Sequence, residues 1–381
     1  MILLFVACNL VHAQQTIHDA ITHNGIQRSF ILYIPTSYSP EIAAPLVFNF
    51  HGYTSNAQAQ MAYGDFREIA DTAGFLLVHP QGILDGNGAT HWNAEWGTGV
   101  DDIGFTDALI DSLAANYQID LSRVYSTGMS NGGYMSYTLA CRLSHRMAAV
   151  ASVTGSMTVW QLNNPNGCDP QRPVPVMQFH GTSDGVVPYN GSNWSGAIDN
   201  VLQYWVDVNN CDTQAEIYPV ANIFLLDGST AEHHVFRNGD NGVEVEFYKI
   251  FNGGHTWPGT RFPNGITNYD INASEKIWQF FSQYDINGRI VLTETDRLNN
   301  HPSEVSVYPN PARDILRITS SETLGSRLKL ITLLGLEVIN QKIDQRNASS
   351  ISVQHLKAGI YFLKVMDIQD EVSSIHKVFI K

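Results

Sequence analysis

The sequence predicts an α/β domain, in which helices cover both faces of a mostly parallel sheet, followed by a small C-terminal β-sandwich. Three observations support this prediction. From residue 27 onward, apolar runs typical of buried strands alternate with segments whose apolar residues have helical spacing. After residue 302, short strands of alternating polarity replace that pattern. All seven Trp and all four Cys precede residue 302, so the composition changes at the same place.

The elements of the α/β part follow from these patterns. Pro45–Phe50 is a nearly continuous apolar run that stops at His51-Gly52, which is typical of a parallel strand buried on both faces. By the same criteria, the predicted strands are 45–50, 74–79, 123–127, 148–154, 174–179 and 243–250. The predicted helices are 61–73, 106–117, 131–143 and 273–284. Ligands of such sheets bind beyond the carboxyl ends of the strands, so the loops after the strands are the candidate sites.

The C-terminal part differs in charge as well as in pattern. The first 301 residues contain 12 basic and 28 acidic residues, a net charge of −16, whereas the last 80 contain 10 basic and 8 acidic residues, a net charge of +2. Its predicted strands are 316–319, 328–332, 337–341, 350–353, 360–365 and 374–380. This part contains no cluster of catalytic residue types, so we assign it no chemistry. The predicted division is a signal peptide at 1–13, the α/β domain at 14–285, a linker at 286–305 and the sandwich at 306–381.

Length and charge exclude several classes of protein. The chain has 381 residues, of which 44% are hydrophobic and 15% charged, as in an ordinary globular protein. A net charge of −14 argues against nucleic acid or an anionic membrane surface as a partner. The 14 His residues form no H-x-x-x-H pair with a suitable acidic third ligand, so we expect no metal and no other cofactor.

The N-terminus has the features of an export signal. Met1–Ala7 is apolar and leads to Val11-His12-Ala13, a small-x-small site for cleavage before Gln14. A lipoprotein site at Cys8 and a plain buried strand are the alternatives. The usual basic n-region is missing, which indicates a start codon several residues upstream.

Cleavage leaves three cysteines, Cys141, Cys168 and Cys211, in an oxidising compartment. An odd number allows at most one disulfide within the chain. Cys168 and Cys211 lie in turn-rich polar sequence, whereas Cys141 lies on an apolar helix face. We therefore expect a disulfide between Cys168 and Cys211.

Two segments match the pattern G-x-S-x-G, which in one structural context presents a nucleophilic serine. That context is a strand, a sharp turn between small residues, and a helix whose N-terminus faces the serine. Ser130, in Gly128-Met-Ser-Asn-Gly132, follows a predicted strand and precedes an amphipathic helix. Ser183 follows a strand but runs into Gly185-Val-Val-Pro188, which cannot start a helix of any length. The sequence therefore predicts Ser130 as the nucleophile, with a helix N-cap as its alternative role.

A serine nucleophile needs a base, and the base needs an acid that holds its tautomer. In sheets of this type the acid and then the histidine follow the serine along the chain. Asp184 lies in the loop after the predicted strand 174–179, and an Asx turn is its alternative role. His255 follows the predicted last strand through Gly253-Gly254 and precedes Pro258. For the tetrahedral intermediate, the expected N–H donors are the amides of Asn131 and of Tyr53.

Residues 25–285 resemble the secreted polyhydroxybutyrate depolymerase and feruloyl or acetyl xylan esterase family of α/β-hydrolases. The segments that carry the resemblance are 45–52, 100–105, 123–133, 180–184, 187–189 and 254–258. It implies Ser130 as nucleophile, Asp184 as acid and His255 as base. One departure is Tyr53, where many members of the family have Cys or Gly.

Residues 306–381 resemble the C-terminal sorting domain of the type IX secretion system of Bacteroidota. The matching segments are Val307-Tyr-Pro-Asn-Pro311, Leu356–Val365 and the basic terminus Lys377–Lys381. The resemblance implies passage through the periplasm, the type IX machinery as a partner, and a secreted or outer cell-surface location. A carbohydrate-binding sandwich is the alternative, but the segment has no Trp.

Together these features predict a serine carboxylic-ester hydrolase that acts through an acyl-enzyme. Aromatic residues near the predicted triad suit a feruloyl group or a sugar ring, which favours esters of plant cell walls, a polymeric substrate. The alternatives are polyhydroxyalkanoate hydrolysis by the same mechanism and an inactive binding protein on the same fold. The candidate pocket residues are Tyr53, Trp92, Trp96, Tyr189 and Trp257.

Overall fold

The computed structural model describes residues 14–97, 99–290, 305–320, 324, 327–332, 336–343, 348–366 and 372–381. The chain divides into two compact units, residues 1–290 and 291–381. The predicted signal peptide at 1–13 lies outside the described residues, as do residues 291–304 of the predicted linker. Among the described residues, every helix is too short or too polar to cross a membrane.

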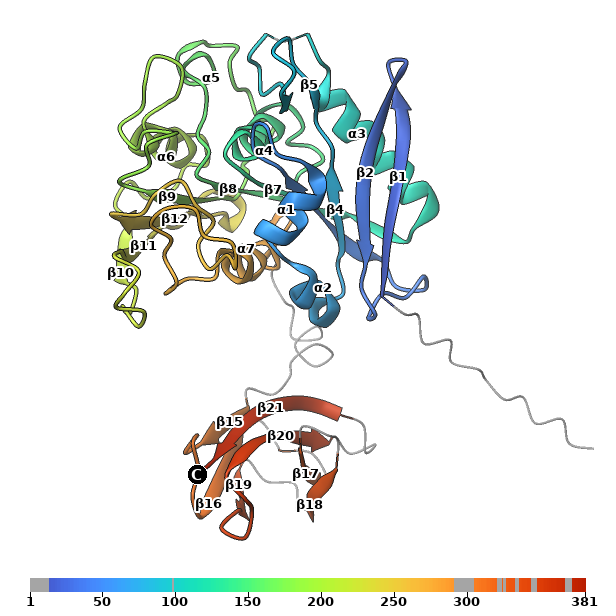
Figure 1. The fold of residues 1–381 in the computed structure, drawn as a ribbon, viewed down its shortest axis with the longest axis vertical. Helices are drawn as coiled ribbons and strands as arrows, with labels where there is room; N and C mark the ends of the chain where they lie inside the picture. The colour runs from blue at the N-terminus through green and yellow to red at the C-terminus, as the bar shows by residue number, and fades with distance from the viewer. Residues whose placement is uncertain are drawn as a thin grey trace, which may run out of the picture. The chain divides into compact units, whose positions relative to one another are not determined.

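A ten-stranded sheet forms the centre of the first unit (Figure 1). Its strands, in spatial order, are β1 (Gln15–His23), β2 (Ile26–Ile34), β4 (Leu76–Pro80), β3 (Ala44–Phe50), β7 (Ile119–Met129), β8 (Ala149–Val153), β9 (Val176–Gly181), β12 (Val245–Phe251), β11 (Thr230–Phe236) and β10 (Glu216–Pro219). The strands from β4 to β12 in this order run parallel, and antiparallel strands continue the sheet at both edges. The two short hairpins of this unit are β5 (Ile83–Leu84) with β6 (Thr90–His91) and β13 (Tyr284–Asp285) with β14 (Gly288–Arg289).

Helices cover both faces of this sheet. The helices are α1 (Ala57–Tyr63), α2 (Arg67–Ala73), α3 (Asp102–Asn116), α4 (Asn131–Arg142), α5 (Val159–Asn163), α6 (Ile198–Val208), α7 (Ala273–Phe281) and the 3₁₀ turn η1 (Asp240–Gly242). One core cluster joins α3, α4 and α6 to side chains such as Leu46 and Phe48 of β3. A second cluster joins α2 and α7 to Val47, because neighbouring residues of a strand point to opposite faces. The predicted α/β-hydrolase fold class is confirmed by this architecture.

The prediction of a single helix at 61–73 is wrong, because this segment belongs to two helices, α1 and α2. Gly64 separates α1 from α2, and a Cβ at this glycine would lie 2.9 Å from Cζ2 of Trp257. The side chain of Asn49 donates a hydrogen bond to the Gly64 carbonyl at 2.8 Å, so the carbonyl takes a partner outside the helix. Tertiary packing therefore breaks a segment that has an unbroken helical pattern in the sequence.

The second unit contains two antiparallel sheets, as expected for a small β-sandwich. One sheet has the order β15 (Val305–Tyr308), β16 (Ile315–Ser320) and β19 (Ala348–Ser352). The other has the order β18 (Glu337–Lys342), β17 (Arg327–Thr332), β20 (Gly359–Met366) and β21 (Val372–Ile380). Residues 286–290, expected to begin the linker, instead complete the β13–β14 hairpin of the first unit.

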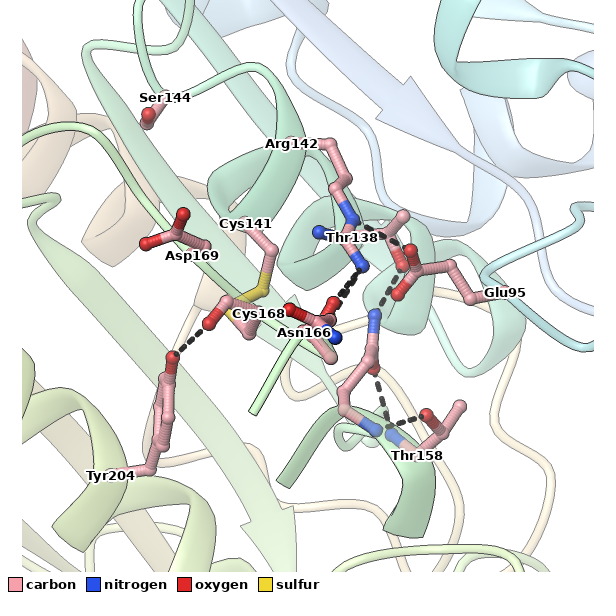
Figure 2. The surroundings of a disulfide bond; sticks show 12 residues. Glu95, Thr138, Cys141, Arg142, Ser144, Thr158, Asn166, Cys168, Asp169 and Tyr204 are labelled. Carbon is pink, nitrogen blue, oxygen red and sulfur yellow. Dashed lines mark hydrogen bonds and ion pairs between the residues drawn. A yellow bond between two sulfur atoms is a disulfide. The ribbon is translucent and has the colours of Figure 1, made fainter. Parts of the chain in front are cut away.

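The predicted disulfide is wrong in its pairing. Cys141 of α4 is bonded to Cys168, and Cys211 is a free, buried thiol (Figure 2). The apolar helix face that carries Cys141 packs against the loop that carries Cys168, whereas the Cys211 sulfur lies 3.8 Å from the Val243 carbonyl. Burial raises the pKa of the Cys211 thiol to about 11, which disfavours the reactive thiolate.

Removing the Cys141–Cys168 bond should destabilise the first unit. The bond closes a loop with a sequence separation of 27. Its removal by Cys168→Ala should cost about 3.5 kcal/mol and lower Tm by roughly 10 °C on loop-entropy grounds. The thiols should be titrated in the unfolded, unreduced chain from residue 14 onward, which lacks Cys8. The titration should find one thiol in the wild type and none in the matched control Cys211→Ala. Two thiols in Cys211→Ala would mean that Cys168 pairs with Cys211 after all.

Candidate active site

Ser130 occupies a sharp turn between β7 and α4. Its backbone has φ 55° and ψ −117°, a strained conformation for a residue with a side chain. The side chain makes no capping hydrogen bond to the described backbone of α4, so the alternative role as an N-cap does not explain the serine. The turn instead places the Ser130 hydroxyl at the carboxyl edge of the sheet.

The two glycines of the motif let the turn pack closely. A Cβ at Gly132 would lie 2.1 Å from the carbonyl oxygen of Phe50, and one at Gly128 would lie 2.6 Å from the Gly132 carbonyl. Only glycine fits at such separations, because any side chain would displace backbone. The G-x-S-x-G pattern therefore reflects the contact between this turn and the end of β3.

Asp184 and His255 form a hydrogen-bonded pair after β9 and β12. The Nδ1 atom of His255 lies 2.7 Å from Oδ2 of Asp184, a buried carboxylate. The other carboxylate oxygen accepts the backbone N–H groups of Val186 and Val187 at 2.8 and 2.9 Å. The Asx turn and the acid role are thus not alternatives, because the turn holds the carboxylate that orients His255.

A second histidine, His180, supports Asp184 from within the core. Burial lowers the pKa of His180, so the ring is neutral near pH 7. Its Nε2 lies 2.8 Å from the Val187 carbonyl, to which it must donate a proton, and 3.6 Å from Oδ2 of Asp184. A neutral donor here leaves the carboxylate charge available to His255.

Ser130 and His255 line the same cleft, which we call the His255 cleft. It has a volume of about 700 Å³. Its described lining residues are Gly52, Tyr53, Thr54, Ser55, Ala59, Gln60, Ala62, Tyr63, Met129, Ser130, Val186, His255, Phe262 and Asn264. The structure thus brings the predicted nucleophile, base and acid to one edge of the sheet. Such an arrangement can transfer a proton from a serine hydroxyl to an imidazole.

The rival residues have other roles. Ser183 is exposed in a turn, and its hydroxyl lies 3.4 Å from the Asn252 side chain. Asp101 caps α3 by accepting the Gly104 N–H at 2.8 Å. Asp102 is buried, and its carboxylate accepts from the Arg28 guanidinium at 2.5 Å and from the Asn93 N–H at 2.7 Å. These contacts assign both aspartates to the framework.

The loop after β3 passes close to Ser130 at Gly52, the residue before Tyr53. A Cβ at Gly52 would lie 3.5 Å from the Cβ of Ser130. His51 holds this loop, because its Nε2 accepts the Gly82 N–H at 2.9 Å and its Nδ1 therefore donates to the Gly52 carbonyl at 2.7 Å. Burial lowers the pKa of His51 to about 4, so this arrangement is neutral and persists at pH 7.

Trp92 connects the serine turn to the same loop. The Asn131 side chain accepts the Trp92 N–H at 2.7 Å and donates to the Trp92 carbonyl at 3.0 Å. The indole N–H of Trp92 donates to the His51 carbonyl at 3.0 Å. Trp92 therefore links the two backbone segments that carry the expected oxyanion donors, Asn131 and Tyr53.

A second cavity of about 330 Å³ adjoins Ser130, and we call it the tryptophan pocket. Its described lining residues are Tyr53, Asp85, His91, Trp92, Trp96, Ser130, Asn131, Tyr134, Val186, Val187 and Trp194. Tyr53, Trp92 and Trp96 were predicted as pocket residues. Tyr134 and Trp194 were missed. Trp194 stands alone in a polar, turn-rich loop, a setting that does indicate an exposed aromatic residue.

Two predicted pocket residues lie elsewhere. The Trp257 side chain is buried, its indole N–H donates to Ser274 at 3.2 Å, and its ring packs edge-on against Phe66. It fills the core between α1, α2 and α7. Tyr189 is also buried, and its hydroxyl donates a hydrogen bond to Asp199 of α6 at 2.6 Å. Neither residue is among the described lining residues of the two cavities that contain Ser130, so both predictions are wrong.

The described residues contain no group of three or more His, Cys, Asp or Glu side chains arranged to hold a metal ion.

Comparison with known families matches two parts of the chain. Residues 28–161 match the model described as esterase PHB depolymerase. These residues are similar to that family. Residues 306–381 match the model described as secretion system C-terminal sorting domain. This confirms both predicted resemblances, and the sorting domain places the protein outside the cell, either secreted or at the cell surface.

Curated relatives that match this part of the chain carry esterase names. A bifunctional acetylxylan esterase/xylanase of Neocallimastix patriciarum is 27% identical over 78% of this chain, and feruloyl esterase B of Piromyces equi is 28% identical over 60%. The aligned regions cover 39% and 42% of those two proteins, so the chain matches less than half of each.

A solved structure shares the fold of the first unit. The acetyl xylan esterase from Aspergillus awamori superposes with a TM-score of 0.51 at 15% identity. The match covers 71% of this chain and 99% of the other.

Replacing Asp184 and Asp102 separately should distinguish the acid from the framework. Asp184→Asn keeps size but places an NH₂ opposite His255 Nδ1, which favours the imidazole tautomer that cannot take a proton from serine. Its kcat should fall by up to about 10⁴-fold, with a small change in Tm. Asp102→Asn leaves the Arg28 charge unpaired and should cost about 3–5 kcal/mol of stability while the folded fraction keeps its kcat. Collapse of kcat in Asp102→Asn, with wild-type kcat in Asp184→Asn, would contradict this assignment.

Proposed function

We propose that the protein is a secreted serine carboxylic-ester hydrolase that removes feruloyl or acetyl groups from plant cell-wall xylan. The observation that carries the proposal is the Asp184–His255 pair, which opens on the same cleft as the strained Ser130. The esterase names of the curated relatives and the esterase family model support ester hydrolysis. The sorting domain supports export through the type IX machinery.

The reaction would proceed through an acyl-enzyme. The Ser130 hydroxyl attacks the ester carbonyl carbon while Nε2 of His255 takes its proton. The amides of Asn131 and Tyr53 stabilise the oxyanion of the tetrahedral intermediate. The intermediate collapses, His255 returns the proton to the leaving alcohol, and the acyl group stays on Ser130. Water, activated by His255, then repeats the sequence and releases the acid.

The two cavities suggest where each half of the substrate binds. The leaving alcohol takes its proton from His255, and among the described residues His255 lines the His255 cleft but not the tryptophan pocket. The alcohol therefore belongs in the cleft and the acyl group in the pocket. The exposed rings of Trp96 and Trp194 provide flat aromatic walls that suit a planar aromatic acyl group. An acetyl group would leave most of the 330 Å³ empty, so the pocket favours feruloyl.

Polyester hydrolysis is the second candidate, because the family model bears the name of PHB depolymerases. The same triad would cleave such a chain. A polyester has no aromatic group to fill the tryptophan pocket, however, and we therefore place it second.

A substrate panel with one pocket variant tests this proposal. Wild-type enzyme should hydrolyse methyl ferulate and feruloylated arabinoxylan but not polyhydroxybutyrate granules. Trp96→Ala should lower kcat/KM for methyl ferulate by about ten-fold, and that for 4-nitrophenyl acetate by less than about two-fold. The matched control Phe262→Ala, in the His255 cleft, should leave the ratio between the two acyl groups unchanged. Hydrolysis of granules with no activity on methyl ferulate would make the protein a polyester depolymerase.

A further inference from the structure

A third cavity lies across the Trp96–Trp194 wall from the tryptophan pocket. It is an open groove of about 600 Å³, here called the Trp160 groove. Its described lining residues are Glu95, Trp96, Thr158, Val159, Trp160, Asn163, Asn164, Pro165, Asn193 and Trp194. Trp96 and Trp194 line both the groove and the tryptophan pocket, whereas Trp160 lines only the groove.

Three tryptophans expose their rings in this groove. Trp160 is 44% exposed, Trp194 41% and Trp96 36%, although such large apolar side chains are usually covered. The Trp96 and Trp194 rings lie 5.8 Å apart. A contiguous set of exposed aromatic rings on a secreted protein marks a binding surface. The site chemistry proposed above does not use Trp160.

The groove is held rigid by the disulfide region. Trp160 lies on α5, which begins with a capping box between Thr158 and Gln161. Figure 2 shows Arg142, next to the Cys141–Cys168 disulfide, bonded to Glu95 and to the loop at Asn166. The Arg142 guanidinium also lies 5.7 Å from the centre of the Trp160 ring. A platform fixed in this way loses little conformational entropy when it binds a ligand.

The chemistry of the groove fits a neutral glycan. Among its described lining residues Glu95 is the one charged side chain, and Arg142 pairs with it at 2.6 Å. An anionic polymer therefore gains no free cation here. The amides of Asn163 and Asn193 are exposed and offer both donors and acceptors, which match sugar hydroxyls. A polyester has only acceptors, whereas a pyranose also has an apolar face of C–H groups that can stack on indole.

We propose that the Trp160 groove is a second binding site for a neutral polysaccharide chain, which holds the enzyme on its polymeric substrate. The C-terminal part of the chain contains no Trp, so the catalytic unit itself supplies the aromatic platform. The inference rests on the proposed function for the identity of the polymer, xylan. The stretch of polysaccharide bound in the Trp160 groove is distinct from the ester-bearing sugar, which occupies the His255 cleft.

Binding without turnover tests the groove directly. Full-length Ser130→Ala protein should bind insoluble arabinoxylan, and adding Trp160→Ala should weaken that binding by about ten-fold. Asn193→Ala, on the opposite loop, should also weaken it and serves as a second variant should Trp160→Ala fold poorly. The matched control is Leu226→Ala, which removes a side chain that is 94% exposed outside the groove. It should bind as the parent does.

Catalytic measurements separate this inference from the proposed function. In the active enzyme, which retains Ser130, Trp160→Ala should keep kcat/KM for methyl ferulate within about two-fold. The variant should lose activity only on the insoluble polymer. Equal arabinoxylan binding by the parent and both groove variants would overturn the inference. It would also be overturned if the groove variants lost binding to polyhydroxybutyrate granules rather than to arabinoxylan. Trp160-dependent binding in an enzyme inactive on both ferulate and acetyl esters would keep the groove and reject the proposed function.

Discussion

The strained backbone of Ser130 is the constraint on which the candidate site depends. A residue with a side chain adopts φ 55° and ψ −117° only when its surroundings leave no alternative. Those surroundings are the close contact of Gly132 with the end of β3 and the two hydrogen bonds between the Asn131 side chain and the Trp92 backbone. The same two contacts place the loop of Tyr53 beside the serine. The strained turn thus lies beside the two backbone segments that carry the expected oxyanion donors.

Neutral buried histidines complete this framework. His51 and His180 each donate one ring proton to a backbone carbonyl of a loop at the site. Burial lowers the pKa of both rings, so they serve as fixed dipoles rather than as charges near pH 7. The charge at the centre of the site belongs to Asp184, which faces His255. A neutral His180 beside this carboxylate keeps the field at His255 simple and preorganised.

Local patterns in the sequence predicted the parts of the structure that depend on local rules. The alternation of strands and helices predicted the sheet, and the G-x-S-x-G context distinguished Ser130 from Ser183. Contacts between distant segments were not predictable in this way. The break at Gly64 depends on Trp257, almost two hundred residues later, and the Cys141–Cys168 bond depends on how α4 packs against a loop. Trp257 was assigned to the pocket from its distance in sequence to His255, but its side chain points into the core.

The most direct test of the central claim is covalent labelling with a fluorophosphonate, which reacts with an activated serine. Wild-type protein and Ser183→Ala should be labelled at the same rate, with the adduct on the peptide that contains Ser130, and Ser130→Ala should not be labelled. Labelling that persists in Ser130→Ala and disappears in Ser183→Ala would contradict the account, because the nucleophile would then lie outside the strained turn.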